Sequence, residues 1–269
     1  MIQFKNEFLT VFESSLYKTT TAVVETSDAV IMTDPNWLAV EVEAIRQYVN
    51  ERLGDKQLYI IYTHSDFDHI IGSGAFPNAT VIASKELADH PHKQEIMEKI
   101  KSFDDRYYVT RNYTPEYPSV DFIVSKDGQA LELESITLIF YRAPGHTGDG
   151  IFTVIEPYGI FLSGDYLSDV EFPFIFGSYK DYVETVGKAQ HILQAHHITI
   201  HIPGHGTTTQ DQHEIQKRIE QSDYYLKELP HDEGDLEQYL SKTYHFYDGM
   251  KSIHTDNKKK AKSSMKHNE

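Results

Sequence analysis

Thr63-His64-Ser65-Asp66-Phe67-Asp68-His69 places four side chains that can bind a metal within six positions of one another. The stretch follows Leu58-Tyr59-Ile60-Ile61-Tyr62, whose β-branched and aromatic residues predict a buried strand. We therefore expect the four side chains on a loop at the carboxyl end of a strand, where α/β sheets commonly carry their functional residues. Imidazole and carboxylate groups together suit zinc, manganese or iron. Taken alone, the stretch is also compatible with a polar surface loop.

Three later stretches repeat the pattern of a strand, a tight turn and one metal-binding side chain. Each follows a hydrophobic run that predicts a strand. They are Pro144-Gly145-His146-Thr147, Ser163-Gly164-Asp165 and Pro203-Gly204-His205-Gly206. This repetition favours a metal site over a surface loop.

The order of these motifs resembles that of the metallo-β-lactamase fold superfamily of metallohydrolases, over about residues 10–225. The resemblance implies an α/β fold, a four-layer αβ/βα sandwich of two mixed β-sheets flanked by helices. It also implies two metal ions and their ligands. The first ion would bind His64, Asp66 and His146, the second would bind Asp68, His69 and His205, and Asp165 would bridge them. Asp34 matches an acidic residue that ends an early strand in this family, and it would support the metal loop from outside the ligand set.

One position departs from the family pattern, because Asp66 stands where a second histidine is usual. Two divalent ions bring four positive charges, and Asp66, Asp68 and Asp165 remove three of them. A water bound there should be a weaker acid than at a site with three imidazoles. Zinc is the first expectation, with manganese or iron as alternatives, and loss of the first metal is a further alternative.

The predicted function is hydrolysis at a dinuclear metal site. A hydroxide bridging the ions would attack a small ester, lactone or phosphoester, and Asp68 would orient the attacking water and accept its proton. Two alternatives from other classes stay open. One is a di-iron protein of the same fold that binds oxygen or carries out redox chemistry, and the other is a metal-dependent binding protein without turnover.

Composition excludes several classes of function. The 269 residues include no cysteine, which rules out disulfides and thiolate ligands, and the net charge of −16 argues against nucleic-acid partners. We expect a small-molecule substrate instead. No apolar run approaches the roughly 18 residues of a membrane helix, and the first residues do not resemble a signal peptide, so we expect a cytoplasmic protein without membrane contact.

The remaining expectations concern the substrate pocket and the ends of the domain. Five aromatic residues are candidates for a pocket wall, with ordinary packing as the alternative: Trp37, Tyr166, Phe172, Phe174 and Phe176. Residues 101–124 are expected to form an exposed connection with half-buried aromatic residues, and the family resemblance implies substrate-contacting structure as the alternative. Residues 234–250 are expected to form a helix that caps the site or contributes to a homodimer. The domain is expected to span residues 1–256, followed by a disordered basic tail over residues 257–269.

Overall fold

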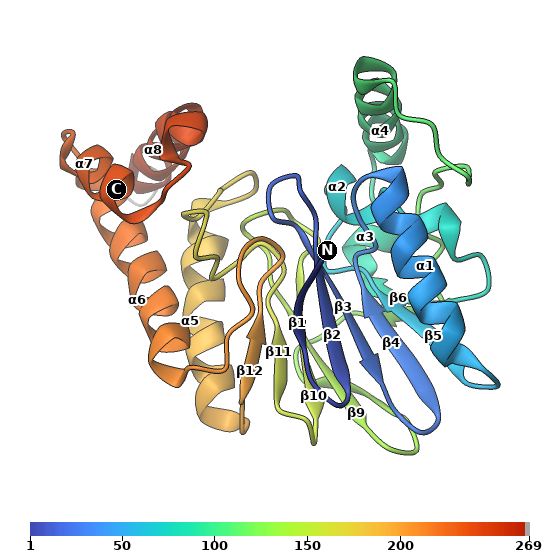
Figure 1. The fold of residues 1–269 in the computed structure, drawn as a ribbon. Coiled ribbons are helices and arrows are strands. Elements are labelled where there is room, and N and C mark those ends of the chain that lie inside the picture. The colour runs from blue at the N-terminus through green and yellow to red at the C-terminus, as the bar shows by residue number, and fades with distance from the viewer. Residues whose placement is uncertain (267–269) are drawn as a thin grey trace.

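Two mixed β-sheets form the centre of the computed structural model, which describes residues 1–266 (Figure 1). The first sheet has seven strands in chain order, antiparallel from β1 to β4 and parallel from β4 to β7. Its strands are β1 (Ile2–Lys5), β2 (Leu9–Glu13), β3 (Thr20–Glu25), β4 (Ala29–Thr33), β5 (Gln57–Ile61), β6 (Thr80–Ser84) and β7 (Phe122–Val124).

The second sheet has five strands in the order β12-β11-β10-β9-β8, of which only β11 and β12 run parallel. Its strands are β8 (Gln129–Glu132), β9 (Thr137–Arg142), β10 (Ile151–Glu156), β11 (Ile160–Leu162) and β12 (Ile200–Ile202).

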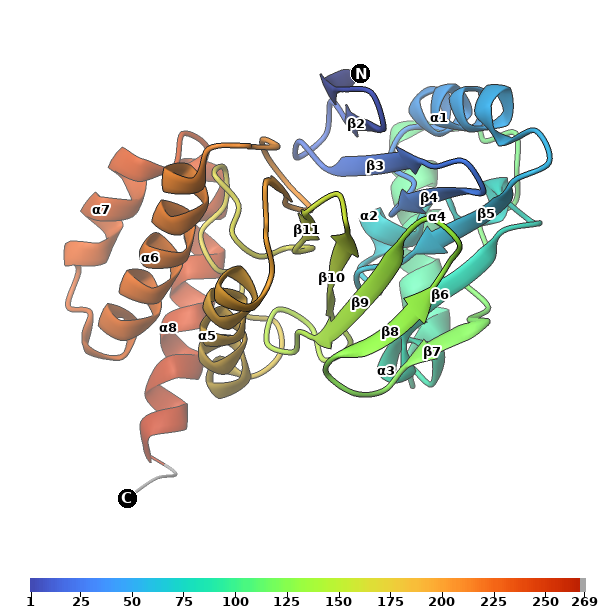
Figure 2. The ribbon, with the colours of Figure 1, turned by 90° about the horizontal axis from the view of Figure 1, so that it is seen from below.

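Helices cover the outer faces of both sheets (Figure 2). The first sheet carries α1 (Ala39–Leu53), α2 (Phe67–Ile70), η1 (Ser73–Ala75), α3 (Lys85–Ala88) and α4 (Lys93–Tyr107). On the side of the second sheet lie α5 (Tyr179–Ala195), α6 (Gln212–Glu228), η2 (Leu229–His231), α7 (Asp235–Thr243), η3 (Tyr247–Met250) and α8 (Lys251–Lys266). Within residues 1–266, none of the helices combines the length and apolar character needed to cross a membrane.

The alternation of side chains along the strands creates the layers. In β4, Ile31 faces the other sheet, whereas Val30 and Met32 face the helix α1. Val11 of the first sheet and Phe140 of the second share the core between the sheets. The predicted four-layer αβ/βα sandwich is therefore confirmed.

The expectation of a connection over residues 101–124 is wrong for its first part, because α4 continues to Tyr107, although most of residues 101–107 are exposed and Phe103 is half-buried, as expected. Ile96 and Ile100 are buried, and Phe103 packs on Trp37 with ring centroids 4.7 Å apart. The apolar stripe at helical spacing therefore extends the helix beyond the point where the aromatic and acidic residues begin.

The expectation of a disordered tail from residue 257 is also wrong for residues 257–266, because α8 runs to Lys266. Residues 267–269 lie outside the described part of the chain. His254, Asn257 and Ala261 are buried at helical spacing. The Asn257 amide donates to the carbonyl of Pro173 (2.6 Å) and accepts from the amide of Ile175 (3.0 Å). The lysine-rich composition predicted disorder, although Lys258 and Lys260 themselves bond to Asp232 and to the carbonyls of Ile175 and Phe176.

A buried carboxylate anchors α8 to the preceding helices. Asp232 accepts hydrogen bonds from the Lys258 ammonium (2.9 Å) and from the amides of Gly234 and Leu236. Burial alone would raise the pKa of Asp232, but these hydrogen bonds and the charge of Lys258 lower it to about 2. A carboxyl with a lowered pKa stabilises the folded state above its unfolded pKa and loses that contribution as the pH falls toward its folded pKa.

We predict that Asp232→Asn lowers the free energy of unfolding at pH 7 by about 2 kcal/mol. The difference from the parent protein should shrink as the pH falls from about 4 to about 2. Urea denaturation of the metal-free proteins across this pH range measures it. Asp248→Asn is the control, because that carboxylate is exposed and should give no measurable change. An equal effect of Asp232→Asn at all pH values would contradict this account.

Candidate metal centre

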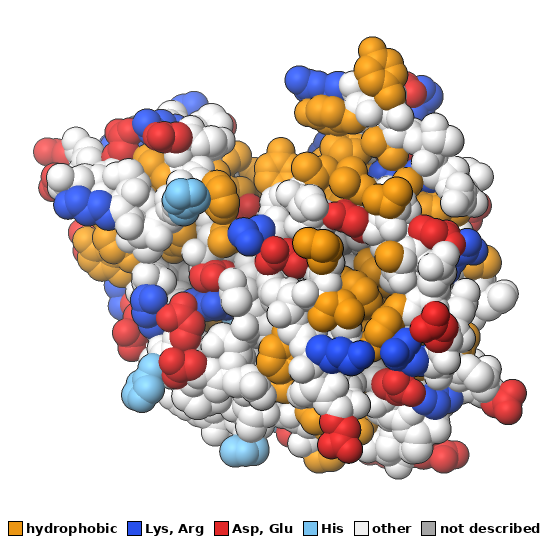
Figure 3. All heavy atoms as spheres, viewed as in Figure 1, with side chains coloured by type: hydrophobic (Ala, Val, Ile, Leu, Met, Phe, Trp, Pro, Cys, Tyr) orange, Lys and Arg blue, Asp and Glu red, His pale blue; other side chains and the backbone are white. Residues whose placement is uncertain are grey.

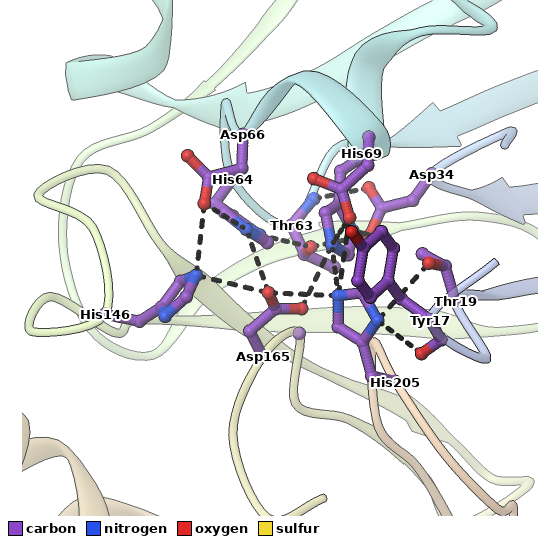
Figure 4. A network of polar contacts seen from close by, with 12 residues as sticks. Tyr17, Thr19, Asp34, Thr63, His64, Asp66, His69, His146, Asp165 and His205 are labelled. Atoms are coloured by element: carbon purple, nitrogen blue, oxygen red, sulfur yellow. Dashed lines mark hydrogen bonds and ion pairs between the residues drawn. The ribbon is translucent and has the colours of Figure 1, made fainter. Parts of the chain in front are cut away.

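The loops that follow four strands meet at one edge of the sandwich. His64 and Asp66 follow β5, His146 follows β9, Asp165 follows β11 and His205 follows β12. Asp68 and His69 lie in the short helix α2, directly after the β5 loop. The structure thus brings all seven predicted metal ligands together, and Figure 4 shows the labelled ones converging on Asp165.

Four side chains form the first group. The Oδ2 atom of Asp165 lies 3.5 Å from His64 Nε2 and 3.1 Å from His146 Nε2. Asp66 Oδ2 lies 3.3 Å from His146 Nε2 and 3.8 Å from His64 Nε2. These separations are of the size expected between donor atoms that share one ion, so the four residues could hold a metal.

The second group lies on the other side of Asp165. His69 Nε2 is 3.0 Å from Asp165 Oδ1, and His205 Nε2 is 3.2 Å from Asp165 Oδ2. Asp68 Oδ2 lies 3.5 Å from His69 Nε2 and 3.4 Å from His205 Nε2. Asp165 therefore touches both groups, as a bridging ligand would.

Asp34 orients two of the four imidazoles. Its buried carboxylate accepts hydrogen bonds from Thr63 Oγ1 (2.6 Å), from the Thr63 amide (2.8 Å) and from His69 Nδ1 (3.0 Å). Because the Thr63 hydroxyl donates to Asp34, it must accept from His64 Nδ1, 3.0 Å away. Both histidines consequently carry their proton on Nδ1 and direct the Nε2 lone pair into the centre.

Backbone carbonyls orient the other two imidazoles. His146 Nδ1 donates to the carbonyl of Phe174 (2.8 Å), and His205 Nδ1 donates to the carbonyl of Tyr17 (2.9 Å). Tyr17 lies beside His205 in Figure 4. All four imidazoles therefore present Nε2 lone pairs to a common space, the tautomer that a metal requires.

Three of the ligand atoms facing this space lack hydrogen-bond partners among residues 1–266. His64 Nε2, His146 Nε2 and Asp165 Oδ1 are buried without a hydrogen bond. In addition, His69 Nε2 and His205 Nε2 are only 3.2 Å apart, and two lone pairs cannot face each other at that distance without a proton or a cation between them. Buried polar atoms are almost always paired, so these residues fit a bound metal.

The charges of the cluster support the same conclusion. Burial opposes ionisation of Asp165, but the nearby histidines, His205 and His69 foremost, hold the pKa of its carboxyl well below the ordinary value. Burial also opposes protonation of His69, yet Asp165 and Asp68 raise its pKa well above the ordinary value. Without a metal the cluster would therefore retain protons on its imidazoles, and a divalent cation could replace them.

The sequence of residues 16–190 matches the family model described as the metallo-beta-lactamase superfamily. The chain belongs to the metallo-beta-lactamase superfamily. Its members are metallohydrolases as a class, and the fold typically binds metal ions, which agrees with the two groups of histidine and aspartate found here. No curated protein matches the chain.

Solved structures show the same fold at low sequence identity. A metallo-beta-lactamase family protein from Thermus thermophilus aligns with a TM-score of 0.61 at 18% identity, over 83% of this chain and 80% of that one. A metallo-beta-lactamase from Pontibacter korlensis gives a TM-score of 0.60 at 13% identity, over 84% and 98%. The sec-alkylsulfatase Pisa1 from Pseudomonas sp. gives 0.67 at 12% identity, over 89% of this chain and 43% of that one. These similarities establish the fold, not a substrate.

The glycines next to the metal-binding residues are required for steric reasons in this metallo-beta-lactamase fold. A Cβ atom on Gly204 would lie 2.3 Å from Asp165 Oδ1, inside the contact distance of any two unbonded atoms. A Cβ atom on Gly145 would meet the backbone of Tyr182 at 2.4 Å, and this residue has a φ of +127°. The glycines that accompany His205 and His146 thus allow the ligand loops to approach their neighbours.

The five aromatic residues proposed for the substrate pocket differ in their burial. Trp37 and Phe172 are each only 1% exposed and lie in the hydrophobic core, so the expectation that they line the pocket is wrong. Tyr166 is buried as well. Its hydroxyl accepts a hydrogen bond from the amide of His146 and shares its single proton between the carbonyls of Ala143 and Pro144. Phe176 is half-exposed and its ring packs at a tilt against His146, with ring centroids 5.1 Å apart, while Phe174 lines an open cleft.

Sequence reasoning missed most of the residues that orient the ligands. Thr63 could have been found, because a hydroxyl directly before the first ligand can reach its imidazole. The carbonyls of Tyr17 and Phe174 leave no signal in the sequence, since any residue type provides one. His201, outside the ligand set, is fully buried, and its Nε2 atom lies 2.9 Å from Ser163 Oγ. Burial and the charge of Arg218 keep the pKa of His201 well below the ordinary value.

We predict that Asp34→Asn weakens metal binding by roughly 10- to 100-fold, the usual cost of losing a carboxylate behind a metal-bound histidine. The asparagine keeps the size of the side chain, but its single oxygen cannot accept all three hydrogen bonds, and its NH₂ group would face a donor of Thr63 or His69. Competition with a chromophoric chelator gives the affinity. Asp121→Asn is the control, because that side chain caps the β6 strand away from the centre. An unchanged affinity in Asp34→Asn would show that Asp34 does not orient the ligands.

Proposed function

We propose that the protein is a metal-dependent hydrolase whose seven clustered residues hold two divalent ions and act on a small ester, lactone or phosphoester. The observation that carries this proposal is the orientation of the four imidazoles around Asp165, with every Nδ1 engaged and every Nε2 directed inward. Membership of a superfamily of metallohydrolases supports it. The net charge of −16 favours a small-molecule substrate over a nucleic acid.

The ions would supply acidity to water and polarise the oxygen of the substrate that gains charge during the reaction. The chain itself would supply the proton acceptor. Asp68 Oδ2 lies between His69 and His205, and its side chain remains 12% exposed at the edge of the centre. An attacking water placed there could donate its proton to Asp68, which would then pass it to the leaving group. Asp165, buried below, would keep both groups at a fixed separation.

We predict that Asp68→Asn lowers kcat by about 10²- to 10⁴-fold, the range lost when a positioned proton acceptor is removed. The amide keeps the shape of the side chain but cannot take up a proton. Hydrolysis of p-nitrophenyl acetate, γ-nonalactone and bis(p-nitrophenyl) phosphate provides the activity, and plasma mass spectrometry provides the metal content.

Most of the metal should remain in Asp68→Asn, since the other donors of the second group are intact. Asp89→Asn, an exposed carboxylate on the surface, is the control and should keep full activity. Undiminished turnover in Asp68→Asn would remove Asp68 from the reaction. Absence of hydrolysis of all three substrates by the fully metal-loaded parent protein would count against the hydrolase.

Asp66 decides which metal the first group prefers. Its carboxylate replaces an imidazole, and, although burial opposes ionisation, the hydrogen bond with His146 and the charge of His64 lower its pKa to about 2. An ionised oxygen ligand favours harder ions such as manganese or iron relative to an all-imidazole site.

We predict that Asp66→His shifts the metal preference of the protein toward zinc. The measurement is metal content after equilibration with equimolar zinc, manganese and iron(II) under anaerobic conditions. The ratio of zinc to the other two should rise in the variant, because borderline-soft zinc gains an imidazole. Identical ratios in the two proteins would mean that Asp66 does not bind the metal.

A further inference from the structure

A cleft of about 550 Å³ lies beside the candidate metal centre. Its walls come from the loop between β2 and β3, from the segment after β11 and from the C-terminal residues around the start of α8. Six of its thirteen lining residues are apolar or aromatic: Tyr17, Val170, Phe174, Phe246, Met250 and Ile253. A volume of this size accommodates a small organic group.

Two of the cleft walls also orient metal ligands through backbone carbonyls. Tyr17 lines the cleft, and its carbonyl accepts from His205 Nδ1. Phe174 also lines it, and its carbonyl accepts from His146 Nδ1. The cleft therefore shares Tyr17 and Phe174 with the backbone that orients one histidine of each metal group, so a molecule bound in it would lie near the centre.

The third wall belongs to the C-terminal segment, which lies beyond the family match at residues 16–190. Asn257 bonds to Pro173 and Ile175, and the Lys260 ammonium donates to the carbonyls of Ile175 and Phe176. These contacts fix α8 against the segment that contains Phe174. The wall is therefore held in place by contacts within the fold, and a wall that is already formed reduces the entropy lost on binding.

Large apolar side chains remain accessible at the mouth of the cleft. Tyr17 is 67% exposed and Phe246 is 49% exposed. Figure 3 shows the molecular surface hollowed between the C-terminal helices and α4, with hydrophobic side chains gathered along the hollow. A grouped apolar surface at the mouth of a cleft is characteristic of a binding site.

The charges in the cleft disfavour an anionic ligand. Glu13 pairs with Lys18 at 3.2 Å, so these two cancel. The carboxylate of Glu171 makes no hydrogen bond or ion pair within residues 1–266, and it leaves the lining with two carboxylates against one ammonium, a net charge of −1. A chain that ends in a carboxylate would meet Glu171 as a like charge.

We propose that this cleft binds a neutral hydrophobic group of the substrate, an acyl chain or an aryl ring, while the scissile ester or lactone lies at the metal centre. The C-terminal segment would thereby determine which substrates are accepted. This inference rests on the proposed hydrolase function and narrows it, because a small hydrophilic ester would gain nothing from the cleft.

The first test uses the metal-loaded full-length protein and p-nitrophenyl esters of acetate, butyrate, hexanoate and octanoate. The value of kcat/KM should rise about fourfold for each methylene, the gain expected from burying one CH₂ group. The p-nitrophenyl monoester of suberic acid has the chain length of the octanoate ester but ends in a carboxylate, and its kcat/KM should be at least about tenfold lower. Glu171→Gln should reduce the difference in kcat/KM between the octanoate ester and the suberate monoester.

Filling the cleft provides the matched variant. Ser252 is exposed on α8 and lines the cleft, so Ser252→Trp should fold normally and abolish the preference for long chains while hydrolysis of the acetate ester continues. Ser263→Trp places the same side chain on an exposed position of the same helix outside the cleft and should leave the preference intact. Equal chain-length dependence in Ser252→Trp and the parent protein would overturn the proposal.

A binding measurement separates failure of this inference from failure of the hydrolase. If no ester is hydrolysed, the proposed function fails, and calorimetric titration of the metal-loaded protein with octanoate and acetate still tests the cleft. Octanoate should bind at least about tenfold more tightly than acetate in the parent protein, and the difference should vanish in Ser252→Trp. Equal affinities of the parent protein for octanoate and acetate would overturn the assignment of the cleft as a hydrophobic subsite.

Discussion

The arrangement of the candidate centre depends on one buried carboxylate, Asp34. It accepts two hydrogen bonds from Thr63 and one from His69. Through the Thr63 hydroxyl it also determines which nitrogen of His64 carries a proton. Asp34 follows β4, a strand surrounded by the core on both faces, so its position is set by the packing of the first sheet. A residue that binds no metal in this account thus links the stability of the sheet to the direction of two metal-binding lone pairs.

The second sheet contributes its ligands in a different way. His146 and His205 are oriented by carbonyls of Phe174 and Tyr17, and both carbonyls belong to segments that also line the apolar cleft. One of these segments is held by Asn257 from the C-terminal helix. The metal centre, the cleft and α8 are therefore coupled through a short run of backbone, and a change in the C-terminal helix could alter both the accepted substrate and the orientation of His146.

The fold and the ligand cluster could be predicted from the sequence because their signals are local. A strand of β-branched residues followed by glycine and a metal-binding side chain recurs at His146, Asp165 and His205, and each glycine is required by a close approach or a turn. The pocket was harder to predict. Trp37 and Phe172 are aromatic residues of the type that often lines pockets, and only tertiary packing places them in the core. The C-terminal helix was missed because its buried positions, Asn257 and Ala261, are separated by lysines and lack an apolar stripe. Carbonyl acceptors cannot be predicted from residue type at all.

The central claim is that two ions lie on either side of Asp165, and anomalous X-ray diffraction from crystals of the metal-loaded protein tests it most directly. The account predicts two anomalous peaks about 3.5–4 Å apart, the usual spacing of a dinuclear site. One peak should lie among His64, Asp66 and His146, the other among Asp68, His69 and His205, with Asp165 in contact with both. A single peak, or peaks elsewhere in the chain, would contradict the account.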